Sequence, residues 1–327
     1  MKKREIKGLI IVSVLAILLS IVPTNYNLVT PGVIEDISPM IEIEDAKGDE
    51  TGEIMLAAVT VRRARLIHLL YVNLFSPEFT RLEPVPEIDM DKYFELMQEM
   101  MKESQLTAKT VALEKAGYQT VIKGDGAKIE DLLDNFDAAS KLKAGDIIVE
   151  VEGSEVELAT DVQEKLKNKE VGEKITVKVL RDNEELNFEI KTKALEDESE
   201  IPAIGVLISS YNREVELPLD MKIDAGKIGG PSAGSMFALE IYNQLTEEDI
   251  TGGNKIAGTG SIDLNSNINR IDGVRQKIKA AADEKVDYFF VPADNQEEIA
   301  DFGDQYQGVN LVVVSNFDQL ITYLNQL

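Results

Sequence analysis

A glycine- and proline-rich turn that leads directly into a helical run constrains the fold of this chain more than any other feature. The turn is Gly229-Gly230-Pro231, and the helical run extends from Met236 to Leu245, with Ser232 between them. Glycine permits backbone conformations and close approaches that other residues do not. The sequence therefore predicts a tight junction into a helix, over 232–245, with a serine near its first turn.

A lysine on a second helical run is placed to face this serine. Lys277 lies 45 positions after Ser232 (277 − 232), within the run Gln276 to Ala282. The chain has no cysteine, and His68 is its one histidine, so a Cys-His pair is excluded and a Ser-His-Asp triad needs His68. A serine activated by lysine is the simplest nucleophile that remains.

Lys277 can act as a base only as the neutral amine. The pKa of lysine in water is about 10.4, so neutrality at pH 7 costs about 4.6 kcal/mol. Burial lowers a lysine pKa by up to about 3 to 5 units, and Ile271, Val274 and Ile278 supply apolar neighbours. Two plainer interpretations stay open from the residues alone, in which Ser232 caps a helix and Lys277 is a solvated helix residue.

Composition excludes several classes of function. The net charge of −25 argues against nucleic acid or anionic lipid as the main ligand, because phosphate groups require clustered cations. One histidine and no cysteine exclude a His/Cys metal site. The stretch through Ser235 resembles a phosphate loop, but a serine stands where that loop needs lysine. We therefore expect no metal, no cofactor and no ATP.

The N-terminal residues 1–30 predict a membrane anchor. Basic residues precede an uncharged run from Gly8 to Val22, and acidic residues follow it. We expect a single-pass helix with a cytoplasmic N-terminus and an extracellular remainder. A cleaved signal peptide is the alternative, although no small-residue cleavage site follows the run.

Residues 31–116 read as a first region of strands followed by helices. Strands are expected between 31 and 62, a helix from Asp91 to Lys102, and a short helix from Thr107 to Ala116. A methionine and aromatic stripe on the first helix, from Tyr93 to Met101, is expected to pack in the core. We expect the same of His68, which stands among leucines and isoleucines.

Residues 117–195 predict a separate unit of short strands and one helix, and residues 196–327 an alternation of strands and helices. The acidic stretch Glu196 to Glu200 is the most linker-like part of the chain. Tyr288 to Pro292 and Leu311 to Val314 read as buried parallel strands. The predicted fold class is α+β or mixed α/β.

Several of these motifs together resemble known families. Gly230-Pro231-Ser232-Ala233-Gly234 is similar to the nucleophile motif of Lon-type proteases, and the strand from Ala257 to Asp263 and the segment from Ile271 to Ala281 continue the resemblance. Residues 117–195, with Leu142-Lys143-Ala144-Gly145-Asp146, resemble a PDZ domain. With the anchor, the chain resembles the membrane-anchored PDZ-domain Lon-like serine proteases of Gram-positive bacteria (the YlbL/SepM type).

The resemblance implies a Lon-type proteolytic domain with an inserted PDZ domain. It makes Ser232 and Lys277 the catalytic dyad of an ATP-independent endopeptidase, with Thr259 orienting the lysine and Gly230 and Ala233 supplying backbone oxyanion contacts. Two departures are Gly229, where Lon proteases usually have aspartate, and Asn269 to Gly273, which replaces Gly-Pro-Ile-Gly-Gly.

The same resemblance assigns partners. The PDZ unit is expected to capture or gate a peptide or protein substrate, with Gly124, Asp125 and Gly126 as a carboxylate nest and Ala127 to Leu133 as the receiving strand. Lon domains commonly form hexameric rings, so a homo-oligomer is also expected as an option. A catalytically inactive, membrane-anchored PDZ adaptor is the alternative function.

Overall fold

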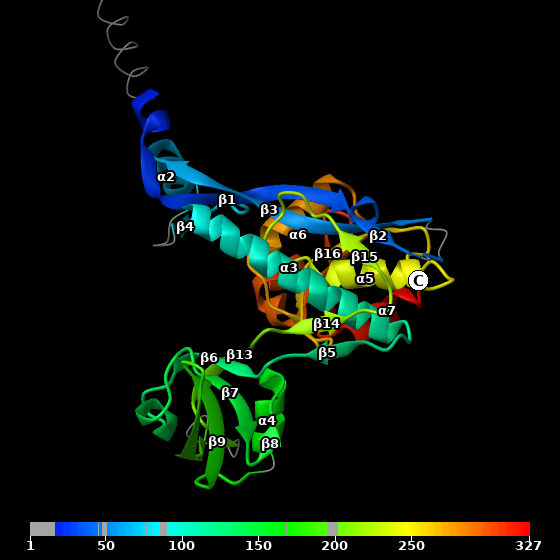
Figure 1. Ribbon diagram of the computed structural model, residues 1–327. Helices are drawn as coiled ribbons and strands as arrows, with labels where there is room; N and C mark the ends of the chain where they lie inside the picture. Colours follow the sequence, from blue (N-terminus) through cyan, green and yellow to red (C-terminus); the bar gives the residue numbers. More distant parts are fainter. Residues whose placement is uncertain are drawn as a thin grey trace, which may run out of the picture. The chain divides into compact units, whose positions relative to one another are not determined.

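The computed structural model describes residues 17–44, 46–47, 51–75, 77–85, 90–167, 169–194 and 202–327. It divides into two compact units (Figure 1), one formed by Met1–Gln119 with Pro218–Leu327 and the other by Thr120–Leu217. The second unit thus lies in sequence between two segments of the first. It runs past the predicted boundary at 195 because strand β13 (Val206–Ser210) pairs with strand β6 (Ala127–Leu132). The predicted linker at 196–200 lies outside the described residues.

The first unit is built on a mixed seven-stranded sheet. The strand order is β20-β21-β19-β16-β3-β1-β4. The neighbours β3, β16, β19 and β21 run parallel, whereas β1, β4 and β20 pair antiparallel at the two sides. The strands of the sheet are β1 (Pro23–Asp36), β3 (Glu53–Arg65), β4 (Arg81–Pro84), β16 (Lys255–Gly258), β19 (Tyr288–Pro292), β20 (Gln305–Tyr306) and β21 (Val309–Val314). The predicted parallel pair of buried strands is thereby confirmed.

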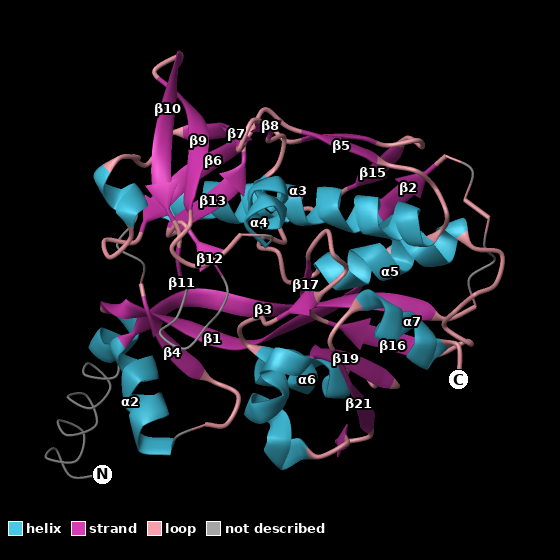
Figure 2. Ribbon diagram, turned by 90° about the horizontal axis from the view of Figure 1, so that it is seen from below, coloured by secondary structure: helices cyan, strands magenta, loops and turns pink. Residues whose placement is uncertain are grey.

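Helices cover both faces of this sheet, with α3 and α5 on one side and α6 on the other (Figure 2). Successive residues of β16 face opposite sides of the sheet. Ala257 packs in a core with Ile278 of α6, whereas Gly258 faces Met236 of α5. A Cβ at Gly258 would lie 2.6 Å from the Met236 sulfur, so glycine permits α5 to approach. The remaining elements are η1 (Ser38–Met40), β2 (Ile41–Ile43), α2 (Leu66–Phe75), α3 (Met90–Lys115), β15 (Met221–Ile223), α5 (Gly234–Leu245), β17 (Ser261–Ile262), β18 (Ile268–Asn269), α6 (Val274–Asp283), η3 (Ala293–Phe302) and α7 (Phe317–Leu324).

Helix α3 is one continuous helix of 26 residues, where two shorter helices were predicted. Thr107 and Thr110 do not interrupt it, since both are buried and the Thr110 hydroxyl donates to the Leu106 carbonyl at 2.9 Å. The predicted core stripe is wrong in part. Met101 is buried, but Phe94 is 60% exposed and Met100 37%, because only one side of this helix packs against α5.

His68 is not the core residue that its apolar neighbours indicated. It lies in the first turn of α2, is partly exposed, and accepts a hydrogen bond at Nδ1 from the Arg65 amide at 3.1 Å. The side chain therefore caps the start of the helix. Partial burial, and then the positive charges of Arg62 and Arg65, lower the pKa of His68.

In the described part of the chain no helix is long and apolar enough to cross a membrane. Residues 1–16 of the predicted anchor lie outside the described residues, and residues 17–21 are helical. Strand β1 begins at Pro23, so the anchor cannot extend to residue 30 as predicted.

The second unit is a small β-rich unit with one packed helix. Its main sheet has the order β10-β9-β7-β6-β13, and β8 pairs with β7. Helix α4 packs on this sheet through Val162 and Leu166. Its elements are β5 (Val121–Lys123), β6, η2 (Asp137–Ser140), β7 (Ile147–Val151), β8 (Ser154–Glu155), α4 (Ala159–Lys167), β9 (Lys174–Arg181), β10 (Glu184–Lys191), β11 (Lys193–Ala194), β12 (Pro202–Ala203), β13 and β14 (Glu214–Glu216).

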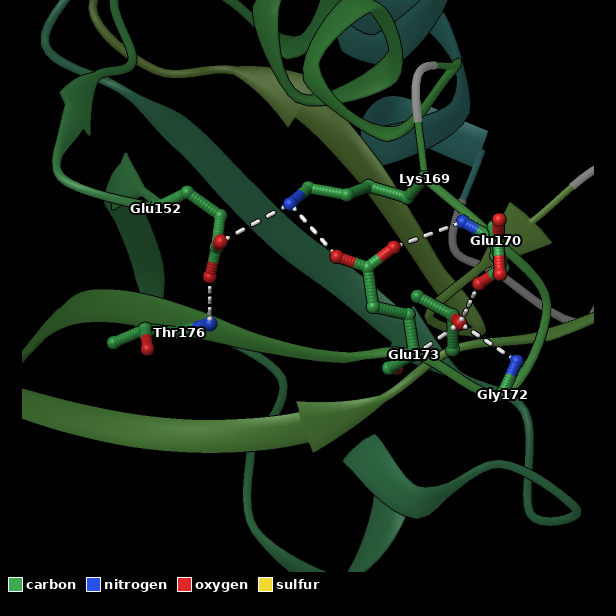
Figure 3. Close-up of polar contacts among 7 residues, drawn as sticks. Glu152, Lys169, Glu170, Gly172, Glu173 and Thr176 are labelled. Carbon is green, nitrogen blue, oxygen red and sulfur yellow. Dashed lines mark hydrogen bonds and ion pairs between the residues drawn. The ribbon is translucent and has the colours of Figure 1, made fainter.

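Charged contacts secure the connection between α4 and β9. Lys169 lies between Glu152 and Glu173, at 3.1 and 2.9 Å, and Glu152 also accepts from the Thr176 amide (Figure 3). Just before β7, Arg181 pairs with the buried Asp146, with Nε of the arginine 2.7 Å from Oδ1 of the aspartate. Salt bridges as exposed as those of Lys169 contribute about 1 kcal/mol or less each, whereas loss of Arg181 would leave the buried Asp146 carboxylate without its ion-pair partner.

Candidate active site

Ser232 lies in the turn that precedes α5. The helix begins at Gly234, two residues later than predicted, and its N-cap is Ala233, which makes no side-chain capping bond. The turn needs a left-handed backbone at Gly230, where φ is +86°. The serine hydroxyl is therefore not a helix cap, and the plainer interpretation of this serine is wrong.

The turn is fastened to the end of strand β16. The Ser232 carbonyl accepts from the Gly260 amide at 2.8 Å and from the Thr259 hydroxyl at 3.0 Å. The Ser235 amide donates to the Gly260 carbonyl at 3.0 Å. These contacts fix the main chain on both sides of the serine, so the position of its Oγ is determined by the sheet as well as by the helix.

Lys277 projects from helix α6, which begins after a left-handed residue. The N-cap, Gly273, has φ +73°, and a Cβ there would lie 2.8 Å from Val59 Cγ1. Val274 and Ile278, on the same helix, are fully buried. The predicted apolar neighbours thus pack into the core of the first unit and carry Lys277 inward with them.

Ser232 and Lys277 meet directly. The Lys277 Nζ lies 2.8 Å from Ser232 Oγ and 2.8 Å from Thr259 Oγ1. The lysine is only 2% exposed. Burial lowers its pKa from 10.5 to about 7, although the negative charge of Asp272 acts in the opposite direction. About half of the lysine is then the neutral amine near pH 7, which is the form that can take a proton from serine.

Thr259 restricts how the amine is oriented. Its hydroxyl has one proton, which it donates to the Ser232 carbonyl. Toward Lys277 it can therefore only accept, so one N–H of the lysine points at Thr259. With that hydrogen placed, the lone pair of the neutral amine can be directed at Ser232 Oγ.

The two predicted oxyanion contacts differ in availability. The Gly230 amide donates to the Met97 carbonyl at 2.9 Å, so it is engaged within the protein and does not point freely into the site. Within the described residues, the Ala233 amide donates to no backbone carbonyl. It directly follows the nucleophilic position and lies at the N-cap of α5, where helix amides attract negative charge.

Helix α3 supplies two contacts that the sequence did not indicate. Besides the bond from Gly230 to Met97, the buried Ser104 donates through its hydroxyl to the Pro231 carbonyl at 3.0 Å. Ser104 and Pro231 are 127 positions apart in the sequence. A buried polar residue inside an apolar helical face is the one sequence signal for such a role, and it does not reveal the partner.

Both departures from the Lon pattern are accommodated locally. Gly229 faces α3, where a Cβ would lie 3.1 Å from Met97 Cβ, so this chain has little room for the usual aspartate. Arg270 donates to the Asp294 carbonyl at 2.9 Å and pairs with Glu298. Its charge is thereby held against η3 and does not contact the lysine.

In the second unit, the predicted carboxylate nest is not formed. The Asp125 amide donates to the Tyr211 carbonyl at 2.9 Å, and the Gly126 amide to the Glu157 carbonyl at 3.1 Å. A Cβ at Gly124 would lie 2.5 Å from that same Glu157 oxygen. These residues close the fold of the unit and offer no pair of free amides to a carboxylate.

The predicted receiving strand is occupied as well. Strand β6 has β7 on one side and β13 on the other, so an extended peptide cannot add to it. Strand β13 is an edge of this sheet and lies beside α4. The sequence patterns did not indicate this pairing, because the paired residues of β13 and β6 are 74 (206 − 132) to 83 (210 − 127) positions apart.

Each of the two units contains a segment that matches a known protein family. Residues 116–192 match the PDZ domain family, and residues 215–326 match the C-terminal proteolytic domain of Lon protease. Lon protease 2 of Bacillus subtilis is 31% identical over 118 residues, which cover 36% of this chain and 20% of that protein. Lon protease of Aster yellows witches'-broom phytoplasma is 32% identical over 94 residues, covering 28% and 12%.

Among solved structures, the PDZ domain of an SdrC-like protein from Listeria monocytogenes is 25% identical and covers 26% of this chain and 87% of its own, with a TM-score of 0.25. The chain spans a fifth or less of the curated Lon proteases. It contains a PDZ domain and a Lon-type proteolytic domain in a mixed α/β fold, and the predictions of both are confirmed.

Proposed function

We propose that the chain is an ATP-independent serine endopeptidase whose nucleophile is Ser232 and whose general base is Lys277. The observation that carries the proposal is the 2.8 Å contact between Ser232 Oγ and a buried lysine whose pKa is about 7. The match to a Lon proteolytic domain supports the same reaction class. Neither group requires a nucleotide or a metal for this chemistry.

In the first step, neutral Lys277 takes the hydroxyl proton as Ser232 Oγ attacks the carbonyl carbon of the scissile peptide bond. The Ala233 amide is the oxyanion donor that we assign, because it follows the nucleophile and begins α5. The Lys277 ammonium then gives its proton to the departing amine nitrogen. A water molecule attacks the carbonyl carbon of the resulting ester and loses a proton to Lys277, which returns a proton to Ser232 Oγ as the ester bond breaks and the carboxylic acid product leaves.

The PDZ domain is proposed to hold an extended segment of the substrate at the edge strand β13 rather than at β6. The free edge and the neighbouring helix α4 support this assignment, because PDZ domains bind peptides by adding a strand beside a helix. We also propose that residues 1–22 anchor the chain in a membrane, with the peptidase on the outer side, from the charge pattern of the sequence.

The test is cleavage of a protein substrate such as casein by the full chain in mild detergent, without ATP. Ser232→Ala and Lys277→Met should each abolish cleavage. Lys279→Met is the matched control, because this lysine lies on the same helix and pairs with Asp283 at the surface, and it should retain activity. Equal cleavage by the wild type and the three variants would exclude a catalytic role for Ser232 and Lys277. If cellular function survives Ser232→Ala but is lost on deletion of residues 120–217, the chain acts as a PDZ adaptor.

A further inference from the structure

Helix α2 turns its apolar face toward solvent. Its large apolar side chains that are at least 37% exposed recur at spacings of three and four residues, on one helical face: Ile67, Leu70, Tyr71, Leu74 and Phe75. Leu74 and Phe75 are more than 70% exposed, and α2 has no buried residue. A helix on a water-soluble surface normally buries such a stripe, so this face requires an apolar environment.

The segment just before β1 extends this face. Residues 17–21 are helical, and Ile17, Leu18 and Ile21 are each more than half exposed. The segment is bonded to the start of α2, since the Leu66 amide donates to the Val22 carbonyl at 3.1 Å and Arg65 to the Ser20 carbonyl at 2.6 Å. Figure 1 shows α2 beside this segment at one end of β1 and β3. We call the exposed apolar residues of α2 the α2 surface, and residues 17–22, which adjoin it, remain part of the proposed anchor.

The stretch of sequence that carries α2 differs in charge from the rest of the chain. Residues 54–77 contain no aspartate or glutamate, in a protein with 59 acidic and 34 basic residues. The same stretch contains Arg62, Arg63 and Arg65, which line a hollow of about 560 Å³ together with Ile21 and Ile67. A cationic hollow beside an apolar helix face complements the phosphates and acyl chains of a lipid.

We propose that the α2 surface lies in the interfacial region of a phospholipid bilayer, with the apolar face of α2 among the acyl chains and the arginines at the phosphates. Continuity with the uncharged run from Gly8 to Val22 favours a bilayer over a protein partner. The inference is independent of the peptidase reaction. It rests on the proposed anchoring only to bring the chain to a membrane, and the experiment separates the two.

The chain has no cysteine, so single cysteines can report on single positions. The full chain is reconstituted in phosphatidylethanolamine and phosphatidylglycerol vesicles, with an environment-sensitive fluorophore on Leu74→Cys. Leu18→Cys reports on the anchor. Leu327→Cys is the control, because Leu327 is 49% exposed at the other end of the chain. Spin-labelled lipids quench only fluorophores that contact the bilayer.

Blue-shifted emission and lipid quenching at positions 18 and 74, with neither at 327, is the expected result. Arg62→Gln with Arg63→Gln should weaken quenching at 74 and leave it unchanged at 18. Quenching at 18 with aqueous emission at 74 would refute the proposal that the α2 surface contacts lipid, and would still support the proposed anchor. Blue-shifted emission at 74 without lipid quenching indicates a protein partner or a second copy, and also refutes lipid contact by the α2 surface. No quenching at either position refutes both anchoring and the α2 surface.

Peptidase activity on a soluble substrate provides a separate readout. Leu74→Glu should leave that activity unchanged, because Leu74 contacts no part of the dyad. The same variant should reduce lipid quenching of a fluorophore placed at Tyr71→Cys, which is 49% exposed on the same face. Unchanged quenching at 71 in the Leu74→Glu variant would contradict the proposed insertion of this face.

Discussion

Replacing the buried lysine should stabilise the first unit while abolishing activity. The pKa of Lys277 falls from 10.5 to about 7 on folding. A difference of about 3.5 units corresponds to about 4.8 kcal/mol. Methionine is similar in length and apolar, and it fits irregular core space. Lys277→Met removes this penalty but also loses the two hydrogen bonds to Ser232 and Thr259, at about 1 kcal/mol each. The expected net gain at pH 6 is about 3 kcal/mol.

The gain should depend on pH in a defined direction. Between pH 7 and 10.5 the unfolded lysine binds more protons than the folded one, so the stability of the wild type rises with pH in this window. The penalty is largest below pH 7 and shrinks above it. The advantage of Lys277→Met should therefore fall from about 3 kcal/mol at pH 6 to about zero near pH 9.

The assay is urea-dependent hydrogen exchange, read by mass spectrometry on peptides from α5 and α6 at pH 6, 7.5 and 9 after correction for intrinsic exchange rates. Lys279→Met is the control, since that lysine lies at the surface and should change stability little at any of these pH values. If Lys277→Met is destabilising at pH 6, or its effect is the same at all three pH values, then Lys277 is not a desolvated base and the reasoning from burial fails.

Three further predictions concern the geometry around the dyad. The kcat/KM for peptide cleavage should rise with pH through a single limb centred near pH 7, following the pKa of Lys277. This limb should persist in the His68→Gln variant, and its loss in that variant would assign the limb to the histidine. Ser104→Ala should lower kcat with little change in KM, because the bond that holds the Pro231 carbonyl is lost; steady-state kinetics measures this, and a rise in KM alone would contradict it. Gly273→Ala should destabilise the first unit by about 1 to 3 kcal/mol, since it forces a left-handed alanine against Val59; urea unfolding checks this, and a change below about 0.5 kcal/mol would contradict it.

Local patterns were sufficient to predict the elements around the site. The Gly-Gly-Pro turn, the helix that follows it and the inward face of the helix with Lys277 are all encoded within about ten residues each. These signals placed a serine and a lysine on elements that the structure joins at 2.8 Å. The geometry is present, and the roles assigned to Ser232, Lys277, Thr259 and Ala233 stay predictions until activity is measured.

Contacts between distant segments were not predictable from the same patterns. The bonds from α3 to Gly230 and Pro231 join residues more than 120 positions apart. The pairing of β13 with β6 joins strands from the two sequence ends of the second unit, which no local pattern relates. His68 and Phe94 were misplaced for a related reason, because an apolar periodicity shows which residues share a face but not what covers that face.

Covalent labelling of the serine tests the central proposal most directly. The full chain is treated with a fluorophosphonate at pH 8, digested, and searched by mass spectrometry for the modified residue. We predict modification of Ser232 in the wild type and in Lys279→Met. In Lys277→Met the labelling rate should fall by at least about a hundredfold, as expected when a general base is removed. Labelling of Ser232 at the same rate with and without Lys277, or no labelling of Ser232 in an active preparation, would contradict the proposal.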